Sequence, residues 1–104
     1  MIILKIDTRD NQKVFALLDI DGKKFEEVST AENKRPESIL TLIEKVCEKA
    51  KISVQDVDTI NVEEGPGSFT GLKVGASVAN ALSFALGKKV NGHEIGTLVE
   101  PKYE

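Results

Sequence analysis

The sequence predicts a single α/β domain with a five-stranded mixed sheet, two main helices and the strand order 3-2-1-4-5. Three observations support this fold class. Residues 1 to 30 contain strand-like runs joined by tight turns. Two helical patterns follow, and each is succeeded by a short apolar run. The glycine turn GPGSFTGLKVG, residues 65–75, joins the fourth strand directly to the second helix.

Size and charge narrow the functional classes. The chain has 104 residues, of which 40% are hydrophobic and 30% charged, which suits one globular domain. Its net charge of −3 and its 14 scattered basic residues argue against a broad nucleic-acid surface. Cys47 has no second cysteine to pair with, and the N-terminus lacks the pattern of a secretory signal. We expect a cytoplasmic protein.

The first strand is predicted over residues 2–7, a mostly apolar run typical of a buried central strand. Asp7 and Thr8 are expected at its end. A carboxylate there suits a metal- or phosphate-facing position in an open α/β sheet, and it equally suits a turn-forming Asx residue. Both alternatives remain open.

The second and third strands are predicted over residues 13–20 and 23–29, on either side of Asp21-Gly22. Asp-Gly between two strand-like runs is a strong hairpin signal, because a type I′ turn needs positive φ at both central positions. The first three strands therefore form an antiparallel meander.

The first helix is predicted from Pro36 to about Lys51. Its apolar stripe at helical spacing comprises Ile39, Leu42, Ile43, Val46 and Ala50. Cys47 adjoins that stripe, and we interpret it as a packed thiol rather than a nucleophile. Residues 53–56 resemble a capping-box turn, and residues 57–62 form the fourth strand.

The glycine turn opens the second helix, with Ser68 as the predicted N-cap. Exposed N–H groups at this helix start suit an anion, or they suit a structural turn alone. The phosphate-loop pattern is absent, since Lys73 stands in no Gly-Lys-Ser/Thr triplet. The turn is therefore interpreted first as a structural element.

The second helix is predicted to end near Leu86, with Gly87 as its stop. Gly71, Gly75 and Ala79 recur every four residues and make one smooth face, which predicts close contact with another helix, within the domain or from a partner. Lys73 and Asn80 argue against a membrane span.

Beyond the second helix, Val90 begins a final strand. His93 lies in a glycine-flanked bend, and without a second histidine we expect a solvated turn residue rather than a metal ligand. Glu63 and Glu64 are interpreted as a solvated strand end rather than an acid–base pair. The sequence thus predicts no metal site.

Three segments together resemble the N-terminal lobe of the TsaB (YeaZ) family of tRNA threonylcarbamoyladenosine proteins. They are LKIDT at residues 4–8, SVQDVDTI at 53–60 and the glycine turn. The similarity spans roughly residues 1–99 and implies a ribonuclease H-like lobe of the actin-like ATPase superfamily. It also implies a non-catalytic subunit that binds no cofactor itself.

The resemblance further implies partners. Family members pair through their N-terminal lobes with a TsaD-like enzyme, in the modification of tRNA adenosine 37. A TsaE-like ATPase joins the pair, ATP is bound by these partner subunits, and tRNA is contacted only indirectly. No membrane is involved.

Two departures from the family stand out. Members are about twice as long and carry a second lobe, so residues 1–104 are expected to be a shortened form in which Val99 to Tyr103 resemble the terminal motif. Arg35 and Pro36 stand where a His-Ser or His-Thr pair is common. A single lobe weakens nucleotide binding, because an actin-like site needs walls from two lobes.

These inferences define two candidate sites. The predicted partner interface comprises Ile39, Leu42, Ile43, Val46, Cys47, Gly71, Val74, Gly75, Val78, Ala79 and Leu82. The possible phosphate-binding residues are Asp7, Thr8, Gly67 and Ser68. Alternative functions are a small nucleotide- or phosphate-binding domain and a homodimeric interaction module. We further expect Gly75→Leu to leave the domain folded and to abolish pairing.

Overall fold

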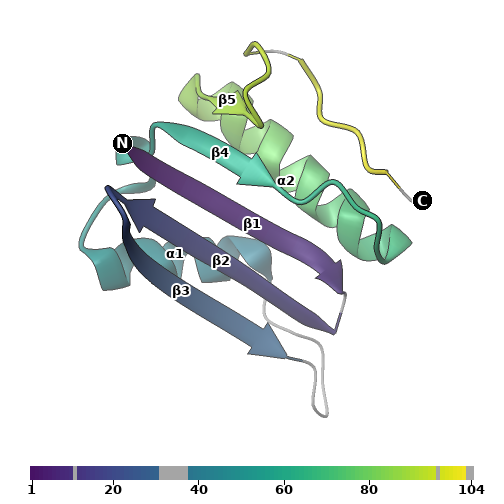
Figure 1. The fold of residues 1–104 in the computed structure, drawn as a ribbon, viewed down its shortest axis with the longest axis horizontal. Helices are drawn as coiled ribbons and strands as arrows, with labels where there is room; N and C mark the ends of the chain where they lie inside the picture. The colour runs from purple at the N-terminus through teal and green to yellow at the C-terminus, as the bar shows by residue number, and fades with distance from the viewer. Residues whose placement is uncertain (11, 31–37, 96, 103–104) are drawn as a thin grey trace.

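A single five-stranded sheet forms the centre of the molecule in the computed structural model, which describes residues 1–10, 12–30, 38–95 and 97–102. The strand order is β3-β2-β1-β4-β5, as predicted. Both long helices lie on one face of the sheet (Figure 1). In chain order the elements are β1 (Ile2–Asp10), β2 (Lys13–Ile20), β3 (Lys23–Thr30), α1 (Ile39–Ala50), the short 3₁₀ helix η1 (Val54–Asp56), β4 (Thr59–Val62), α2 (Phe69–Leu86) and β5 (Lys89–Val90).

The meander forms as predicted. β1 pairs antiparallel with β2, and β2 with β3, while β1–β4 and β4–β5 are parallel. Asp21 and Gly22 both have positive φ, at 52° and 94°, which is the conformation that a type I′ turn requires. β1 is longer than predicted, so Asp7 and Thr8 lie inside the strand rather than at its end. An irregularity in the β1–β2 register falls between Asp7 and Asp10.

The core lies between the sheet and the helix layer. In the register, Leu4 stands beside Leu18 and Ile60, and all three side chains are fully buried. α1 covers β2 and β3, while α2 covers β1, β4 and β5. The buried core residues that the two helices contribute are Ile39, Leu42, Ile43, Val46, Cys47, Leu72, Ala76 and Ala79. Burial of such side chains is the main stabilising contribution, about 1.5–3 kcal/mol for each large one.

Side-chain caps delimit both helices. Ser38 caps α1 by accepting from Thr41 N at 3.2 Å, so α1 begins at Ile39, later than predicted. Pro36, the predicted first helical residue, lies outside the described residues, as does Arg35. Ser68 caps α2 through Gly71 N at 3.1 Å, and Gly87, with φ 66°, ends the helix as predicted. The capping box at Ser53 is also confirmed.

α2 is long and apolar enough to cross a membrane by length and composition alone. That criterion is weak, because a core helix of a soluble protein meets it as well. In this structure the Gly71, Gly75 and Ala79 face of α2 is buried within the domain. The helix therefore acts as a core element of the fold described here.

Candidate functional site

The glycine face of α2 packs on β1 of the same domain. Gly71 and Gly75 are both buried, and a Cβ at Gly71 would overlap the carbonyl oxygen of Thr8. A Cβ at Gly75 would overlap Thr8 Oγ1. The Thr8 hydroxyl also donates to the carbonyl oxygen of Gly71 at 2.6 Å. The close approach that these small residues permit is thus made within the domain by strand β1, whereas the sequence predicted a second helix at this face.

This packing buries most of the predicted partner interface, whose role in pairing stays a prediction. A residue that is buried against its own sheet offers little surface to a partner helix, although Ile43 and Cys47 still line a depression on the outside of the helices. The predicted interface residues in this position are Ile39, Leu42, Ile43, Val46, Cys47, Gly71, Gly75 and Ala79. The predicted residues that retain outward surface are Val74, which is 44% exposed, and the half-buried Val78 and Leu82. The Gly75→Leu expectation is also revised, because the overlap with Thr8 opposes folding.

The glycine turn is held by β1 and by the C-terminal segment. Ser68 N donates to Arg9 O at 2.7 Å, and a Cβ at Gly67 would meet that oxygen at 2.8 Å. Gly65 has φ 122° and its Cβ position is filled by Lys102 O, so no other residue fits there. The Gly65–Pro66 peptide bond is cis. These contacts fix where α2 begins relative to the sheet.

Asp7 is paired with Arg9. Its two carboxylate oxygens accept from Arg9 Nε at 3.1 Å and from Arg9 Nη2 at 2.8 Å, and Oδ1 also accepts from Arg9 N at 3.0 Å. Asp7 in turn holds the pKa of Arg9 above its ordinary value. The carboxylate would have to release the guanidinium before it could bind a metal ion, whereas the half-exposed Arg9 is suited to an anion.

The possible phosphate-binding residues do not all face solvent. Thr8 is 1% exposed and bonded to Gly71, so its hydroxyl cannot reach a ligand unless α2 moves. Ser68 Oγ is committed to its capping bond. Gly67 is exposed beside Arg9. Phosphate binding at Asp7, Gly67 and Ser68 stays a prediction, and Arg9 is the cation that sequence reasoning missed.

A hollow of about 540 Å³ lies on the face of the sheet opposite the helices. Lys5, Asp7 and Phe15 line it from β1 and β2, and Glu64 and Lys102 border it. Asn91 also borders it, and its side chain bonds Val62 N at 2.8 Å and Val62 O at 3.0 Å. The side-chain amide of Asn91 is thus committed to the backbone of β4.

Metal chemistry has little support in the described ranges. No group of three or more His, Cys, Asp or Glu side chains there is arranged to hold a metal ion. His93 is exposed in the turn after β5. Cys47 is a packed thiol, as predicted, and burial raises its pKa. Arg9 bridges Asp7 to Glu63, whose carboxylate lies 3.9 Å away.

The outer surface of the helix layer carries two apolar depressions. The α1–α2 groove, about 510 Å³, is lined by Leu40, Ile43, Glu44, Cys47, Glu48, Ile52, Val54 and Leu82. The α2 hollow, about 480 Å³, is lined by Phe69, Thr70, Lys73, Val74, Ser77 and Val78. Leu40 and Phe69, which are 50% and 63% exposed, were missed in the sequence because they lie off the main apolar stripes.

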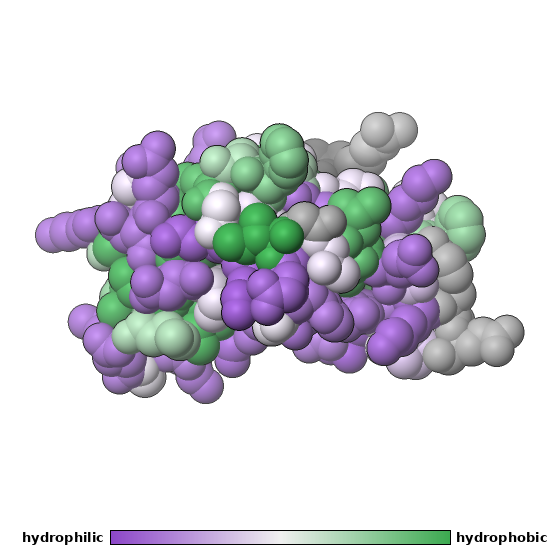
Figure 2. Space-filling model, turned by 90° about the horizontal axis from the view of Figure 1, so that it is seen from above, coloured by the Kyte–Doolittle hydropathy of each residue, from purple (hydrophilic) through white to green (hydrophobic). Residues whose placement is uncertain are grey.

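The C-terminal segment lies along α2 and the glycine turn. Asn80 and Val99 exchange two hydrogen bonds of 3.0 and 2.9 Å, and Val99 is buried. Lys102 N donates to Glu64 O at 2.6 Å. Figure 2 looks onto the side formed by β5, α2 and this segment, and it shows apolar side chains among polar ones. The exposed apolar residues of these elements include Phe84, Ile95 and Leu98.

Known proteins are similar to this chain in sequence and in fold. The family model of tRNA N6-adenosine threonylcarbamoyltransferase, TsaD, matches residues 29–94, more than half of the chain. TsaB of Buchnera aphidicola is 36% identical over 88 residues, which covers 82% of this chain and 40% of that protein. The transferase of Ralstonia pickettii is 44% identical over 68 residues, which covers 60% of this chain and 20% of that protein.

A solved structure agrees with these matches. YeaZ from Pseudomonas aeruginosa superposes with a TM-score of 0.77 and 25% identity, over 86% of this chain and 43% of that chain. The chain therefore spans about two fifths of the TsaB and YeaZ relatives, and its sheet and two helices form the predicted ribonuclease H-like lobe. Sequence and structure together show that the chain belongs to the TsaB (YeaZ)/TsaD family of threonylcarbamoyladenosine proteins.

Proposed function

We propose that this chain is a non-catalytic, TsaB-like subunit that pairs with a TsaD-like enzyme in the threonylcarbamoyl modification of tRNA. The observation that carries the proposal is the outer surface of the helix layer, where the α1–α2 groove and the α2 hollow lie next to exposed Leu40, Phe69 and Val74. Apolar depressions of this kind suit helix–helix contacts. The relatives named TsaB and TsaD support a functional link between two such proteins.

A non-catalytic role suits the polar groups on the other face of the sheet. Asp7 is held by Arg9, and Glu64 accepts from Asn91 Nδ2 at 3.0 Å. A general base needs a free carboxylate within reach of a substrate proton. ATP and a TsaE-like ATPase, in this proposal, act through the assembled complex, with no cofactor bound by this chain.

The test uses two valines of equal exposure on opposite faces. Val74 lines the α2 hollow and is 44% exposed, while Val28 on β3 is 42% exposed and stands opposite Phe15 on the face away from the helices. Val74→Asp should prevent co-elution with the threonylcarbamoyltransferase of the same genome in size-exclusion chromatography with light scattering. Val28→Asp should leave co-elution intact, and circular dichroism should show both variants folded.

Two outcomes would contradict the proposed pairing. One is a wild-type chain that never co-elutes with the transferase, and the other is equal loss of co-elution in both variants. Threonylcarbamoyl transfer to tRNA by the isolated chain would contradict the non-catalytic part.

A further inference from the structure

The two edges of α1 carry opposite charge. Lys49 points toward β3, where its Nζ contacts Glu27 at 2.7 Å and Glu26 O at 2.9 Å. Glu44 and Glu48, one helical turn apart, are exposed and line the α1–α2 groove. Neither glutamate has an ion-pair partner among the residues that the structure describes. The groove therefore has an apolar floor and one acidic edge that no described basic residue pairs with.

The charged residues that are described in the groove lining are all acidic. Its described lining contains two carboxylates and no lysine or arginine. Asp56 is a further carboxylate near the lining residue Cys47, where, after burial, it contributes to the raised pKa of the thiol. A partner with acidic groups at this edge would be repelled, and one with basic groups would be attracted, because complementary charge sets partner choice more than affinity.

We propose that the α1–α2 groove receives an amphipathic helix of another protein that carries Lys or Arg at four-residue spacing along one edge of its apolar stripe. The i and i+4 spacing follows from Glu44 and Glu48, which lie about 6 Å apart along the axis of α1. The apolar stripe would cover Leu40, Ile43 and Leu82. This inference rests on the proposed function, because it describes the chemistry of the partner at the same helix layer.

A second copy of this chain fits the groove poorly. A two-fold interface places the same surface on both sides, so α1 against α1 would set Glu44 and Glu48 against their own counterparts. The α2 hollow offers one lysine, Lys73, instead of a basic pair. The acidic edge thus favours a different protein over self-association.

The probes are two stapled helical peptides of about sixteen residues with the same leucine stripe, one flanked by lysines and the other by glutamates. We expect the wild-type chain to bind the lysine peptide at least tenfold more tightly by calorimetry at low salt. Raising the salt should shrink that difference, because exposed pairs are screened. Glu44→Lys combined with Glu48→Lys should reverse the preference.

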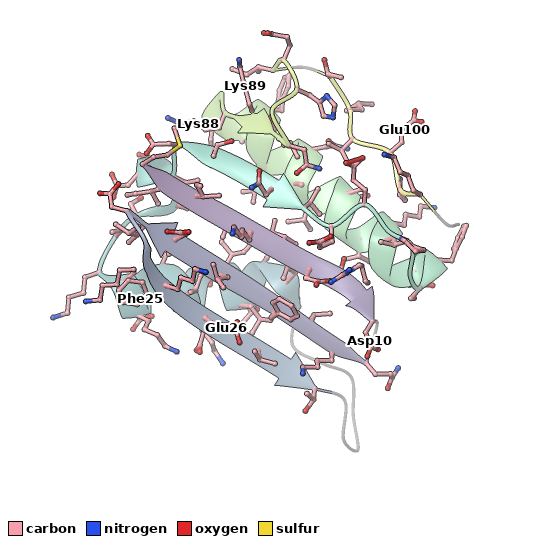
Figure 3. All side chains as sticks on the ribbon, in the orientation of Figure 1. Asp10, Phe25, Glu26, Lys88, Lys89 and Glu100 are labelled. Atoms are coloured by element: carbon pink, nitrogen blue, oxygen red, sulfur yellow. The ribbon has the colours of Figure 1, made fainter. Side chains whose placement is uncertain are left out.

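A control variant separates groove chemistry from net charge. Glu26 lies on β3 and Glu100 on the C-terminal segment (Figure 3), and neither lines the groove. Glu26→Lys with Glu100→Lys therefore makes the same change in net charge elsewhere. This control should keep the wild-type preference. Equal affinity for the two peptides, no binding of either, or the same preference in both double variants would overturn the inference.

The transferase serves as a second probe. If it co-elutes with wild type and with the control but not with the Glu44→Lys, Glu48→Lys variant, the inference is supported. If it co-elutes equally with all three, the acidic edge does not select the partner and only the proposed function stands. If it never co-elutes while the peptide preference holds, the proposed function fails and the inference stands. If the wild-type chain is a dimer and Leu40→Asp makes it monomeric, a second copy occupies the groove and the inference is overturned.

Discussion

Alanine substitutions at the two buried glycines of α2 should behave differently when Thr8 is shortened. A Cβ at Gly71 meets the backbone carbonyl of Thr8, which no side-chain change can remove. A Cβ at Gly75 meets Thr8 Oγ1, and the next contacts, at 3.4 and 3.5 Å, are ordinary. Thr8→Ala should therefore rescue Gly75→Ala and leave Gly71→Ala unrescued.

The change in the free energy of unfolding of each alanine variant is the sum of opposing contributions. Overpacking costs about 1–3 kcal/mol, and moving α2 away to relieve it also breaks the Thr8–Gly71 hydrogen bond, at about 1 kcal/mol. Replacing glycine by alanine in a helix returns about 1 kcal/mol. The net cost is roughly 2 kcal/mol for each single variant. In the Thr8→Ala background neither the overlap nor the hydrogen bond is present and only the alanine gain remains, so Gly75→Ala should stabilise by up to about 1 kcal/mol. The coupling is then about 3 kcal/mol for Gly75 and about 1 kcal/mol for Gly71, where the overlap with the backbone carbonyl persists.

The test is a double-mutant cycle for each glycine, which compares wild type, the glycine variant, Thr8→Ala and the double variant. Urea unfolding followed by circular dichroism provides the free energy of unfolding of all four proteins. Ser77→Ala, at an exposed position of α2, serves as the control for helix propensity and should change stability by less than about 0.5 kcal/mol. Equal coupling at Gly71 and Gly75, or a Gly75→Leu variant as stable as wild type, would refute the packing argument. The second result would restore the smooth helix face as a candidate partner surface.

The remaining predictions concern the C-terminal segment, β4 and the buried thiol. Asn80→Ala removes both hydrogen bonds to Val99 and should cost about 2 kcal/mol, with faster amide exchange at Val99. Asn91→Gly keeps the positive φ of 51° accessible but loses the two bonds to Val62, so it should cost a similar amount in urea unfolding. The free energy of unfolding should fall as pH rises above about 8, because the thiol of Cys47 ionises near its ordinary pKa of 9.0 once unfolded but only at higher pH when buried. Cys47→Val should remove this decrease in the free energy of unfolding above about pH 8.

Each of these predictions has a comparison that could contradict it. Asn61→Ala, on the open face of the sheet, should have little effect, and a loss equal to that of Asn80→Ala would show that the hydrogen bonds to Val99 contribute nothing. For Asn91→Gly, unchanged stability would show that the side-chain bonds to β4 are dispensable. For the thiol, burial raises the pKa of Cys47 in the folded state. Its contribution to the free energy of unfolding is therefore fully present at pH values below the unfolded pKa and is lost as the pH rises toward the folded pKa. A wild-type profile parallel to that of Cys47→Val would contradict it.

The sequence by itself determined the order and type of the elements. Asp21-Gly22 specified the β2–β3 hairpin, since a two-residue turn with positive φ sets the register of both strands. Ser68 and Gly87 delimited α2 because caps satisfy backbone groups that the helix leaves open. These are local effects, and they act between residues that are close in the chain.

Only the tertiary structure decided which surface covers the smooth face of α2. Helical periodicity shows that Gly71, Gly75 and Ala79 share a face, and it contains no information on what lies against that face. Thr8, far away in the chain, provides the covering surface. The same holds for Asn80 and Val99, which are paired because the C-terminal segment returns along α2. Contacts between distant segments depend on the three-dimensional path of the backbone, which residue spacing along the chain does not encode.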